Sequence, residues 1–367
     1  MADADVAVVG GGIVGMSVAC GLVRSGLRVT VFDGDDRDLR ASRGNFGLVW
    51  VQGKGYGLPD YARWTRRSAK LWPDFALSLQ EESGIDLQLS QPGGLFVCLT
   101  EAELEARAEM LVSLKADLGG EYPFDVLDHR TLAEYAPAIG PEVAGATFGP
   151  EDGHVNPLRL LRALHAVFKR RGGRLVGGVT VTGLNHPQGG GFRLSSDSGS
   201  WDAGKLVLAA GLGNLSLGPQ VGLTVPVKPN RGQVLICERI PPFLDYPTGH
   251  VRQTGEGTVQ LGDSKEDVGF NDGTTPEVMA AIAQRAVTMF PVLKGIRVVR
   301  AWGALRIMTT DGFPIYQESG ECAGAYAVTC HSGVTLAAAH AGPLAEWIKT
   351  GSAPAGMASF SGERFHV

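Results

Sequence analysis

The chain has 367 residues, of which 44% are hydrophobic and 19% are charged, and its formal net charge is −5. This length allows two domains around a large core, and the composition is typical of globular proteins. The weak negative charge argues against a protein that binds nucleic acid or a membrane surface.

Neither a membrane span nor a disulfide framework is expected. Residues 6–23 are apolar, but they contain five glycines and a cysteine, which make a poor membrane-spanning helix. The first five residues contain two acids, whereas a signal peptide begins with positive charge. The cysteines are odd in number and none forms C-x-x-C, so we expect reduced thiols in a cytoplasmic protein, without a zinc site. They are Cys20, Cys98, Cys237, Cys322 and Cys330.

The first 33 residues have the pattern of strand, turn, helix and strand. A β-branched run at 6–9 predicts a buried parallel strand. It leads into residues 10–15, which fit the pattern G-x-G-x-x-G. A helix is expected over 16–25 and a second strand over 28–32. The parts of a dinucleotide-binding unit therefore occur in the right order.

Each glycine of this motif has a physical role. Gly10 allows a sharp turn, Gly12 lets a pyrophosphate approach the backbone, and Gly15 lets the helix lie close to the sheet. The helix N-terminus offers free N–H groups to the phosphates. Asp33, which ends the second strand, is expected to accept hydrogen bonds from ribose hydroxyls. We therefore predict cofactor contacts at Gly10, Gly12, Ile13, Val14, Gly15 and Asp33.

A loop rich in small residues follows at 41–57. Its glycines surround Ser42 and Asn45, which suits a loop lying under a flat ring with its amides turned to the ring's heteroatoms. An ordinary surface loop would place Phe46, Leu48 and Trp50 poorly. We predict cofactor contacts from Ser42, Asn45, Phe46, Gly47 and Leu48.

The rest of the chain alternates between helices and strands. Thr100 and Glu103 form a capping box, and Asn156 caps a helix that begins at Pro157. A kink or break is expected at Pro73. Helices are expected over 61–83, 100–118, 158–171, 275–289 and 336–350, with a short turn or helix at 128–134. Strands are expected twice within 86–99 and over 174–176, 179–182, 192–194, 205–211, 225–228, 232–237, 250–253, 258–262, 298–305 and 326–330.

Motifs along the whole chain resemble the D-amino acid oxidase superfamily, in its glycine oxidase and sarcosine oxidase branch. They are Gly10–Gly15, Gly153–Pro157 ahead of a helix, Leu208–Gly211, Arg231–Gln233, Trp302–Arg306 ahead of Thr310–Pro314, and His331–Ala337. Two local stretches, 45–55 and 262–266, are most similar to the flavin subunits of bacterial opine dehydrogenases and hydroxyproline dehydrogenases. The cyanide-forming glycine dehydrogenases are close to these.

The resemblance implies a fold and a cofactor. The fold is a Rossmann-type, glutathione-reductase-like FAD-binding domain with an inserted antiparallel-sheet substrate domain. We expect the FAD domain over 1–85, 145–220 and 300–367, and the substrate domain over 86–144 and 221–299. The cysteine that binds flavin covalently in some sarcosine oxidases would fall near Ala304 here, so we expect non-covalent FAD.

The resemblance also implies site residues. Arg306 matches the family's carboxylate-binding arginine, although a structural salt bridge is the alternative. His250 matches a position where relatives place a tyrosine beside the substrate, and a structural histidine is equally compatible with the sequence. Arg252 is a second candidate for a substrate charge. Further cofactor contacts are expected from Val179, Ala209, Ala210, Gly211, Gly303, Arg306, His331, Ser332, Gly333, Val334 and Thr335.

The implied reaction is oxidation of the C–N bond of an amino acid or an N-substituted amino acid, by hydride transfer to flavin N5. One possibility is a dehydrogenase subunit that passes electrons to partner subunits or a carrier, and the other is a self-sufficient oxidase that reduces oxygen. Gln260 falls where sarcosine oxidases have a lysine, which favours the dehydrogenase. A non-enzymatic flavin subunit is a third possibility, against which Arg306 argues.

Overall fold

The computed structural model describes residues 2–34 and 41–365. Its largest sheet has the strand order β16-β17-β11-β1-β2-β8. Outside this order, β10 pairs with β11, and β9 pairs with β10. β1 pairs in parallel with β2 and β11, which confirms the expected Rossmann-type arrangement. The strands are β1 (Ala4–Val9), β2 (Val29–Asp33), β8 (Arg174–Gly177), β9 (Gly183–Asn185), β10 (Phe192–Ser196), β11 (Gly199–Leu208), β16 (Ile315–Glu318) and β17 (Ala325–Thr329).

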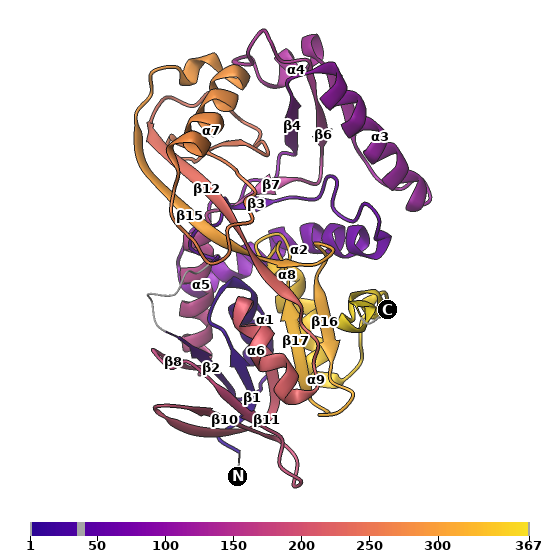
Figure 1. Ribbon diagram of the computed structural model, residues 1–367, viewed down its shortest axis with the longest axis vertical. Coiled ribbons are helices and arrows are strands. Elements are labelled where there is room, and N and C mark those ends of the chain that lie inside the picture. The colour runs from indigo at the N-terminus through magenta and orange to yellow at the C-terminus, as the bar shows by residue number, and fades with distance from the viewer. Residues whose placement is uncertain (1, 35–40, 366–367) are drawn as a thin grey trace.

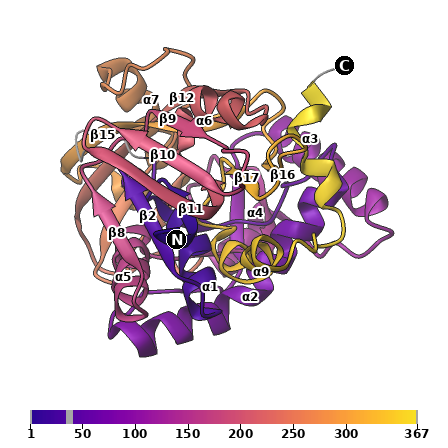
Figure 2. The ribbon, with the colours of Figure 1, turned by 90° about the horizontal axis from the view of Figure 1, so that it is seen from below.

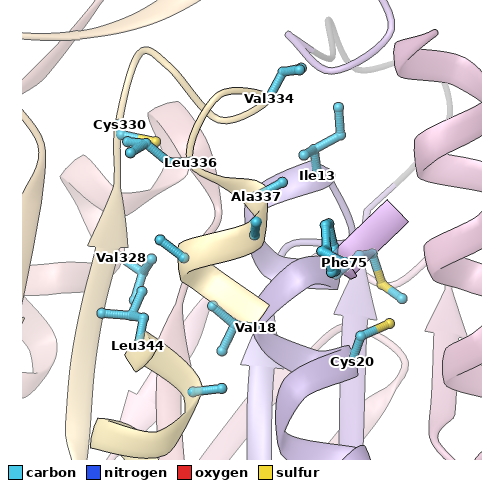
Figure 3. Packing of buried hydrophobic residues seen from close by; sticks show 14 of the residues in the cluster. Ile13, Val18, Cys20, Phe75, Val328, Cys330, Val334, Leu336, Ala337 and Leu344 are labelled. Carbon is cyan, nitrogen blue, oxygen red and sulfur yellow. The ribbon is translucent and has the colours of Figure 1, made fainter. Parts of the chain in front are cut away.

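Helices cover this sheet and form its main core. α1 (Ile13–Arg24) packs against α5 (Pro157–Arg170) and against the final helical segment, which contains α8 (Ala337–Ala339) and α9 (Ala345–Thr350). Figure 3 shows side chains of α1 facing those of the final segment and of β17. A Cβ at Gly21 would lie 2.1 Å from Ala341 O, so a glycine lets these two helices come close. Figure 2 shows the same helices from below.

A second body lies beyond the end of the first sheet, in the upper half of Figure 1. It contains an antiparallel sheet of order β13-β14-β12-β15 and a three-stranded sheet of order β4-β6-β5. One buried hydrophobic cluster joins both sheets to α7 and α4. The elements are β4 (Gly94–Cys98), α3 (Glu101–Asp117), β5 (Asp125–Asp128), α4 (His129–Tyr135), β6 (Gly145–Gly149), β12 (Val227–Arg239), β13 (Val251–Gln253), β14 (Thr258–Leu261), α7 (Pro276–Met289) and β15 (Val298–Thr309).

Three elements connect the two bodies. α2 (Pro59–Ser83) is one helix that contains Pro73, and it lies across the middle of the molecule. The short strands β3 (Leu48–Val49) and β7 (Gly153–His154) pair beside it.

The first body also contains the short helix α6 (Asn214–Leu217). Among the described residues, no helix is both long enough and apolar enough to span a membrane.

Several local predictions were wrong. No strand forms over 179–182, where Val179 N donates a hydrogen bond to Asp33 O and Thr182 N donates one to Ser195 O. One strand, β4, replaces the two expected within 86–99. The strands expected at 225–228 and 232–237 are one long strand, β12, because both halves pair with β15.

The sheets bear on the expected domain boundaries. Residue 145 begins β6, which pairs with β4 and β5, and residue 300 lies inside β15, which pairs with β12. Both boundaries therefore fall within strands of the second body. We propose that the division lies nearer residues 150 and 310.

Candidate active site

The glycine turn after β1 allows a close approach between α1 and the sheet. Gly10 has a φ of +112°, and a Cβ there would lie 2.2 Å from Ala209 O. A Cβ at Gly15 would lie 1.9 Å from Gly10 O. Only glycine fits either position without a backbone shift. The start of α1 is thereby held next to the end of β1, where phosphates have access to free backbone N–H groups.

Asp33 lies beside this turn, at the end of β2. Its Oδ1 accepts a hydrogen bond from Gly11 N at 3.0 Å, and Ser42 Oγ accepts one from Ile13 N at 2.9 Å. Both side chains line the same cavity. An acceptor at the tip of the second strand is placed as ribose recognition requires.

Two neighbouring cavities extend from this turn toward the second body. The first, here called the dinucleotide cavity, has a volume of about 640 Å³. The second, the ring-side cavity, has a volume of about 620 Å³. They adjoin each other, since six residues line both of them: Val14, Ala41, Ser42, Leu305, Ile307 and Cys330.

The walls fit an extended dinucleotide with a flat ring at one end. Gly12 lines the dinucleotide cavity, and a Cβ there would lie 3.0 Å from Ser42 Oγ. Gly333 lines the ring-side cavity, and a Cβ there would lie 2.9 Å from Val14 Cγ2. These missing side chains leave room for a ligand between segments that are distant in the sequence. The acid lies at one end and apolar side chains such as Leu48 line the other, as a polar ribose and a flavin ring require.

Most of the expected site residues are brought together here. The dinucleotide cavity is lined by Gly10, Gly12, Val14, Asp33, Ser42, Val179, Ala209, Ala210 and Gly211. The ring-side cavity is lined by Ile13, Val14, Ser42, Asn45, Phe46, Leu48, His250, Arg306, His331, Ser332, Gly333, Val334 and Thr335. Thr335 joins two of these segments, because its Oγ1 accepts from Trp50 N at 3.1 Å.

Four expected site residues do not line either cavity: Gly15, Gly47, Arg252 and Gly303. Gly15 contributes only through the packing described above. A Cβ at Gly47 would lie 2.4 Å from Val155 O, and a Cβ at Gly303 would lie 2.4 Å from Asp272 O. These glycines allow close contact between chain segments.

Arg252 is directed toward the junction of the two bodies. It is 2% exposed, and its Nη1 donates to Val155 O at 2.7 Å while its Nε donates to Gln260 Oε1 at 2.9 Å. Its pKa is lowered to about 10 by burial. The Gln260 side chain is therefore engaged with Arg252, at the position that the resemblance matched to the lysine of sarcosine oxidases.

Arg306 lines the ring-side cavity and is also ion-paired. Its Nη1 donates to Ser264 O at 2.8 Å, and its Nη2 is paired with the Asp263 carboxylate. The guanidinium lies over Gly232, where a Cβ would be 2.2 Å from Nη2. The geometry thus contains both features that the sequence left open, a cavity-facing guanidinium and a salt bridge.

His250 lies where the ring-side cavity meets a third one. This outer cavity has a volume of about 780 Å³ and shares Phe96, His250 and Asp263 with the ring-side cavity. Burial, followed by the Arg285 charge, lowers the pKa of His250 to about 4. The imidazole is therefore neutral at pH 7, and its Nδ1 has no hydrogen-bond partner among the described residues.

Sequence reasoning missed several residues of the ring-side cavity, among them Lys54, Phe96, Asp263 and Lys265. Burial lowers the pKa of Lys54 to about 8. The signal that could have found Lys54 was its position between two glycines in the loop that was expected to lie under the ring. Phe96 gave no signal, since a strand phenylalanine is usually a core residue.

Comparisons with known proteins place these observations in a family. The family model described as FAD dependent oxidoreductase (DAO) matches residues 5–347. A protein named as a subunit of opine oxidase, from Agrobacterium tumefaciens (strain Ach5), is 44% identical over 368 residues, covering 100% of this chain and 99% of that protein. The opine oxidase subunit of the same name from Rhizobium meliloti is 42% identical, covering 100% and 98%.

Solved structures show the same fold. The crystal structure of glycine oxidase from Geobacillus kaustophilus superposes with a TM-score of 0.89 at 24% identity, covering 98% of each chain. That of L-proline dehydrogenase from P. horikoshii superposes with a TM-score of 0.84 at 21% identity, covering 99% of this chain and 97% of that one.

Proposed function

The chain belongs to the DAO family of FAD-dependent oxidoreductases, and from that premise we propose that it oxidises the C–N bond of an N-substituted amino acid, such as an opine or D-hydroxyproline. The observation that carries the proposal is the Arg306 guanidinium, which lines the ring-side cavity next to the dinucleotide cavity. Two relatives that match over nearly their whole length are named as subunits of opine oxidase.

The residues of the ring-side cavity suit such a substrate. The planar guanidinium of Arg306 can form two parallel hydrogen bonds to a carboxylate, which would orient the substrate's Cα–H. His250 is neutral, so it does not repel a cationic amine before that amine loses its proton. Bound FAD would supply the hydride acceptor, and no covalent nucleophile is required from the protein. The oxidised product is an imine.

We further propose that this chain works as the flavin-bearing subunit of a dehydrogenase. The relatives' names describe a subunit. Among the described residues, no group of His, Cys, Asp and Glu side chains is arranged to hold a metal, so electrons that leave the flavin would need a partner chain or carrier.

A self-sufficient oxidase is the second candidate. Lys54 and Lys265 line the ring-side cavity, and a cation there would stabilise the negative charge that oxygen gains on reduction. Gln260 engages Arg252 instead of facing the cavity, so Lys54 and Lys265 are the lysines that could supply such a cation.

Two measurements test these proposals. Anaerobic mixing with octopine, nopaline, D-hydroxyproline, sarcosine, glycine and D-amino acids should bleach the flavin with at least one N-substituted amino acid. Bleaching by none of them would contradict the proposed reaction. The reduced protein is then mixed with aerated buffer. Slow return of the yellow colour, with much faster turnover on an artificial dye, is expected for the dehydrogenase, whereas reoxidation as fast as substrate reduction would identify an oxidase.

A further inference from the structure

Lys54 lies in a loop whose backbone suits only glycine on either side of it. Gly53 has a φ of +80° and Gly55 has a φ of +87°. A Cβ at Gly55 would lie 2.3 Å from Ala62 N, so the loop is pressed against the first turns of α2. The Lys54 side chain lines the ring-side cavity.

Buried hydrogen bonds hold this loop in place. The carboxylate of Asp152 accepts from Gln52 N at 3.1 Å and from Gln52 Nε2 at 2.7 Å. Tyr122 OH accepts from Gly53 N at 3.0 Å and donates to Val51 O at 2.9 Å. The position of the lysine is therefore determined by contacts on both sides of the loop, as a preorganised binding group requires.

The Lys54 ammonium has one hydroxyl partner and no paired carboxylate among the described residues. Its Nζ donates to Ser332 Oγ, and Ser332 Oγ also accepts from Tyr61 OH at 3.0 Å. Among residues 2–34 and 41–365, no Asp or Glu forms an ion pair with Lys54. Asp152 contributes an attractive charge, but its oxygens are engaged by the loop backbone and Gln52. An unpaired cation is costly in a desolvated site, and an anionic ligand would relieve that cost.

The ring-side cavity therefore contains cationic groups from different parts of the fold. Arg306 comes from β15 in the second body, and Lys54 comes from the loop between β3 and α2. Both line one cavity, yet of these two only Arg306 is paired with a carboxylate of the described residues. A ligand with one carboxylate can satisfy one of these cations, whereas a ligand with a carboxylate at each end can satisfy both.

We propose that Lys54 binds a second carboxylate of the substrate, so that the site selects secondary amines that carry a carboxylate on each side of the nitrogen. The inference rests on the proposed function, because it assigns one carboxylate to Arg306. It makes Lys54 the residue that distinguishes dicarboxylate substrates from monocarboxylate ones. Lys265, which is exposed at the cavity, adds positive charge, and no hydrogen bond or ion pair joins it to another described residue.

Binding of thioethers tests this assignment without any oxidation of a C–N bond. Thiodiacetate and (methylthio)acetate differ by one carboxylate, and their binding to the FAD-bound protein is measured from the change in the flavin absorption spectrum. Thiodiacetate should bind the unaltered protein more tightly. Lys54→Met should weaken thiodiacetate binding on the order of 10- to 100-fold and leave (methylthio)acetate binding unchanged. Lys70→Met, the same substitution at an exposed position of α2, should change neither.

Each outcome decides between the alternatives. An unchanged affinity ratio in Lys54→Met would overturn the assignment, as would an equal loss for both thioethers with FAD content and melting temperature preserved. A shift in the flavin reduction potential without a change in the ratio would show that Lys54 acts on the flavin instead. The matching amines, iminodiacetate and sarcosine, separate this inference from the proposed function. Suppose that Lys54→Met abolishes the preference for thiodiacetate over (methylthio)acetate, but neither amine nor any opine bleaches the flavin of the unaltered protein. The second carboxylate site is then supported, and the proposed reaction is contradicted.

Discussion

The pairing of Arg306 with Asp263 shows which contacts of a single residue can be predicted from the sequence and which cannot. The motif Trp302–Arg306 predicts a substrate-binding arginine, and Arg306 lines the ring-side cavity. The motif contains no information on Asp263, which comes from the turn after β14 and is distant in sequence. Arg252 was a candidate on equal chemical grounds. Residues two apart in a strand share one face, but His250 precedes β13 and only Arg252 lies within it. The alternation rule therefore does not apply to this pair.

Arg306→Ala should weaken substrate binding and leave FAD bound. Loss of a buried charge-assisted pair costs about 2–5 kcal/mol, which corresponds to an increase in Kd on the order of 30- to 5000-fold. Anaerobic titration of the flavin spectrum measures it, and Arg300→Ala, at an exposed position of the same strand, is the matched control. Since the variant leaves Asp263 unpaired, the double variant with Asp263→Asn is also needed. Recovery of normal affinity in the double variant would assign the defect to Asp263 alone.

Denaturation should release free FAD from the polypeptide. Ala304, at the position of the covalent cysteine in some sarcosine oxidases, lines the ring-side cavity and has no thiol. The thiol of Cys330 lines both cavities, but burial raises its pKa to about 12, so the reactive thiolate is scarce. The measurement is the flavin absorbance of the supernatant after acid precipitation. Flavin that stays with the pellet in the unaltered protein but not in Cys330→Ser would identify a covalent link.

At the scale of elements, local signals were reliable where one turn or cap decides the structure. The Thr100 cap forms, with Glu103 N donating to Thr100 Oγ1 at 3.1 Å, and Asn156 caps α5. Long-range pairing was not predictable in the same way. Residues 145–149 contain two glycines and no clear alternation, and they become β6 because β4 and β5 lie on either side. β12 is continuous because β15 pairs along its length.

Gly15→Ala tests the turn that positions α1. The added Cβ would meet Gly10 O at 1.9 Å, so α1 must move away from β1 and from the phosphate position. Overpacking of this kind typically costs about 1–3 kcal/mol, and we expect a lower melting temperature together with reduced FAD content. Gly342→Ala, in the final helical segment where nothing lies within 4 Å of a Cβ, should retain both. Full FAD content in Gly15→Ala would contradict the role given to the turn.

At the scale of the whole molecule, four histidines with lowered pKa values make stability sensitive to acid. Burial lowers the pKa of His154 and His250 to about 4 and that of His331 and His340 to about 3. Unfolded histidines bind protons below about pH 6.5, whereas these four do not until the pH is much lower. The unfolded state therefore gains protons first, and the folded state loses stability as the pH falls.

The free energy of unfolding of the FAD-bound protein should therefore fall between pH 7 and pH 5. Each histidine contributes up to about 1.4 kcal/mol per pH unit. Burial raises the pKa of Asp152 to about 7, so Asp152 binds a proton in the folded state over the same pH range. This proton uptake offsets the loss of stability that about one histidine causes. Denaturant titrations at several pH values measure the slope. A constant free energy of unfolding over this range would show that these histidines are protonated in the folded protein.

The ladder between β12 and β15 has a consequence for cooperativity. It begins at the pair of Val227 and Thr309 and ends at the pair of Cys237 and Val298. Val227 packs in a buried cluster of the first body, and Cys237 packs in the buried cluster of the second. Separate melting of the second body would have to break this ladder and remove one wall of the ring-side cavity, which Arg306 and Gly232 provide. The two bodies should therefore behave as one calorimetric unit, with a single heat-absorption peak whose van't Hoff and calorimetric enthalpies agree. In that case a destabilising substitution in α7, an element of the second body, would also release the flavin from the first body.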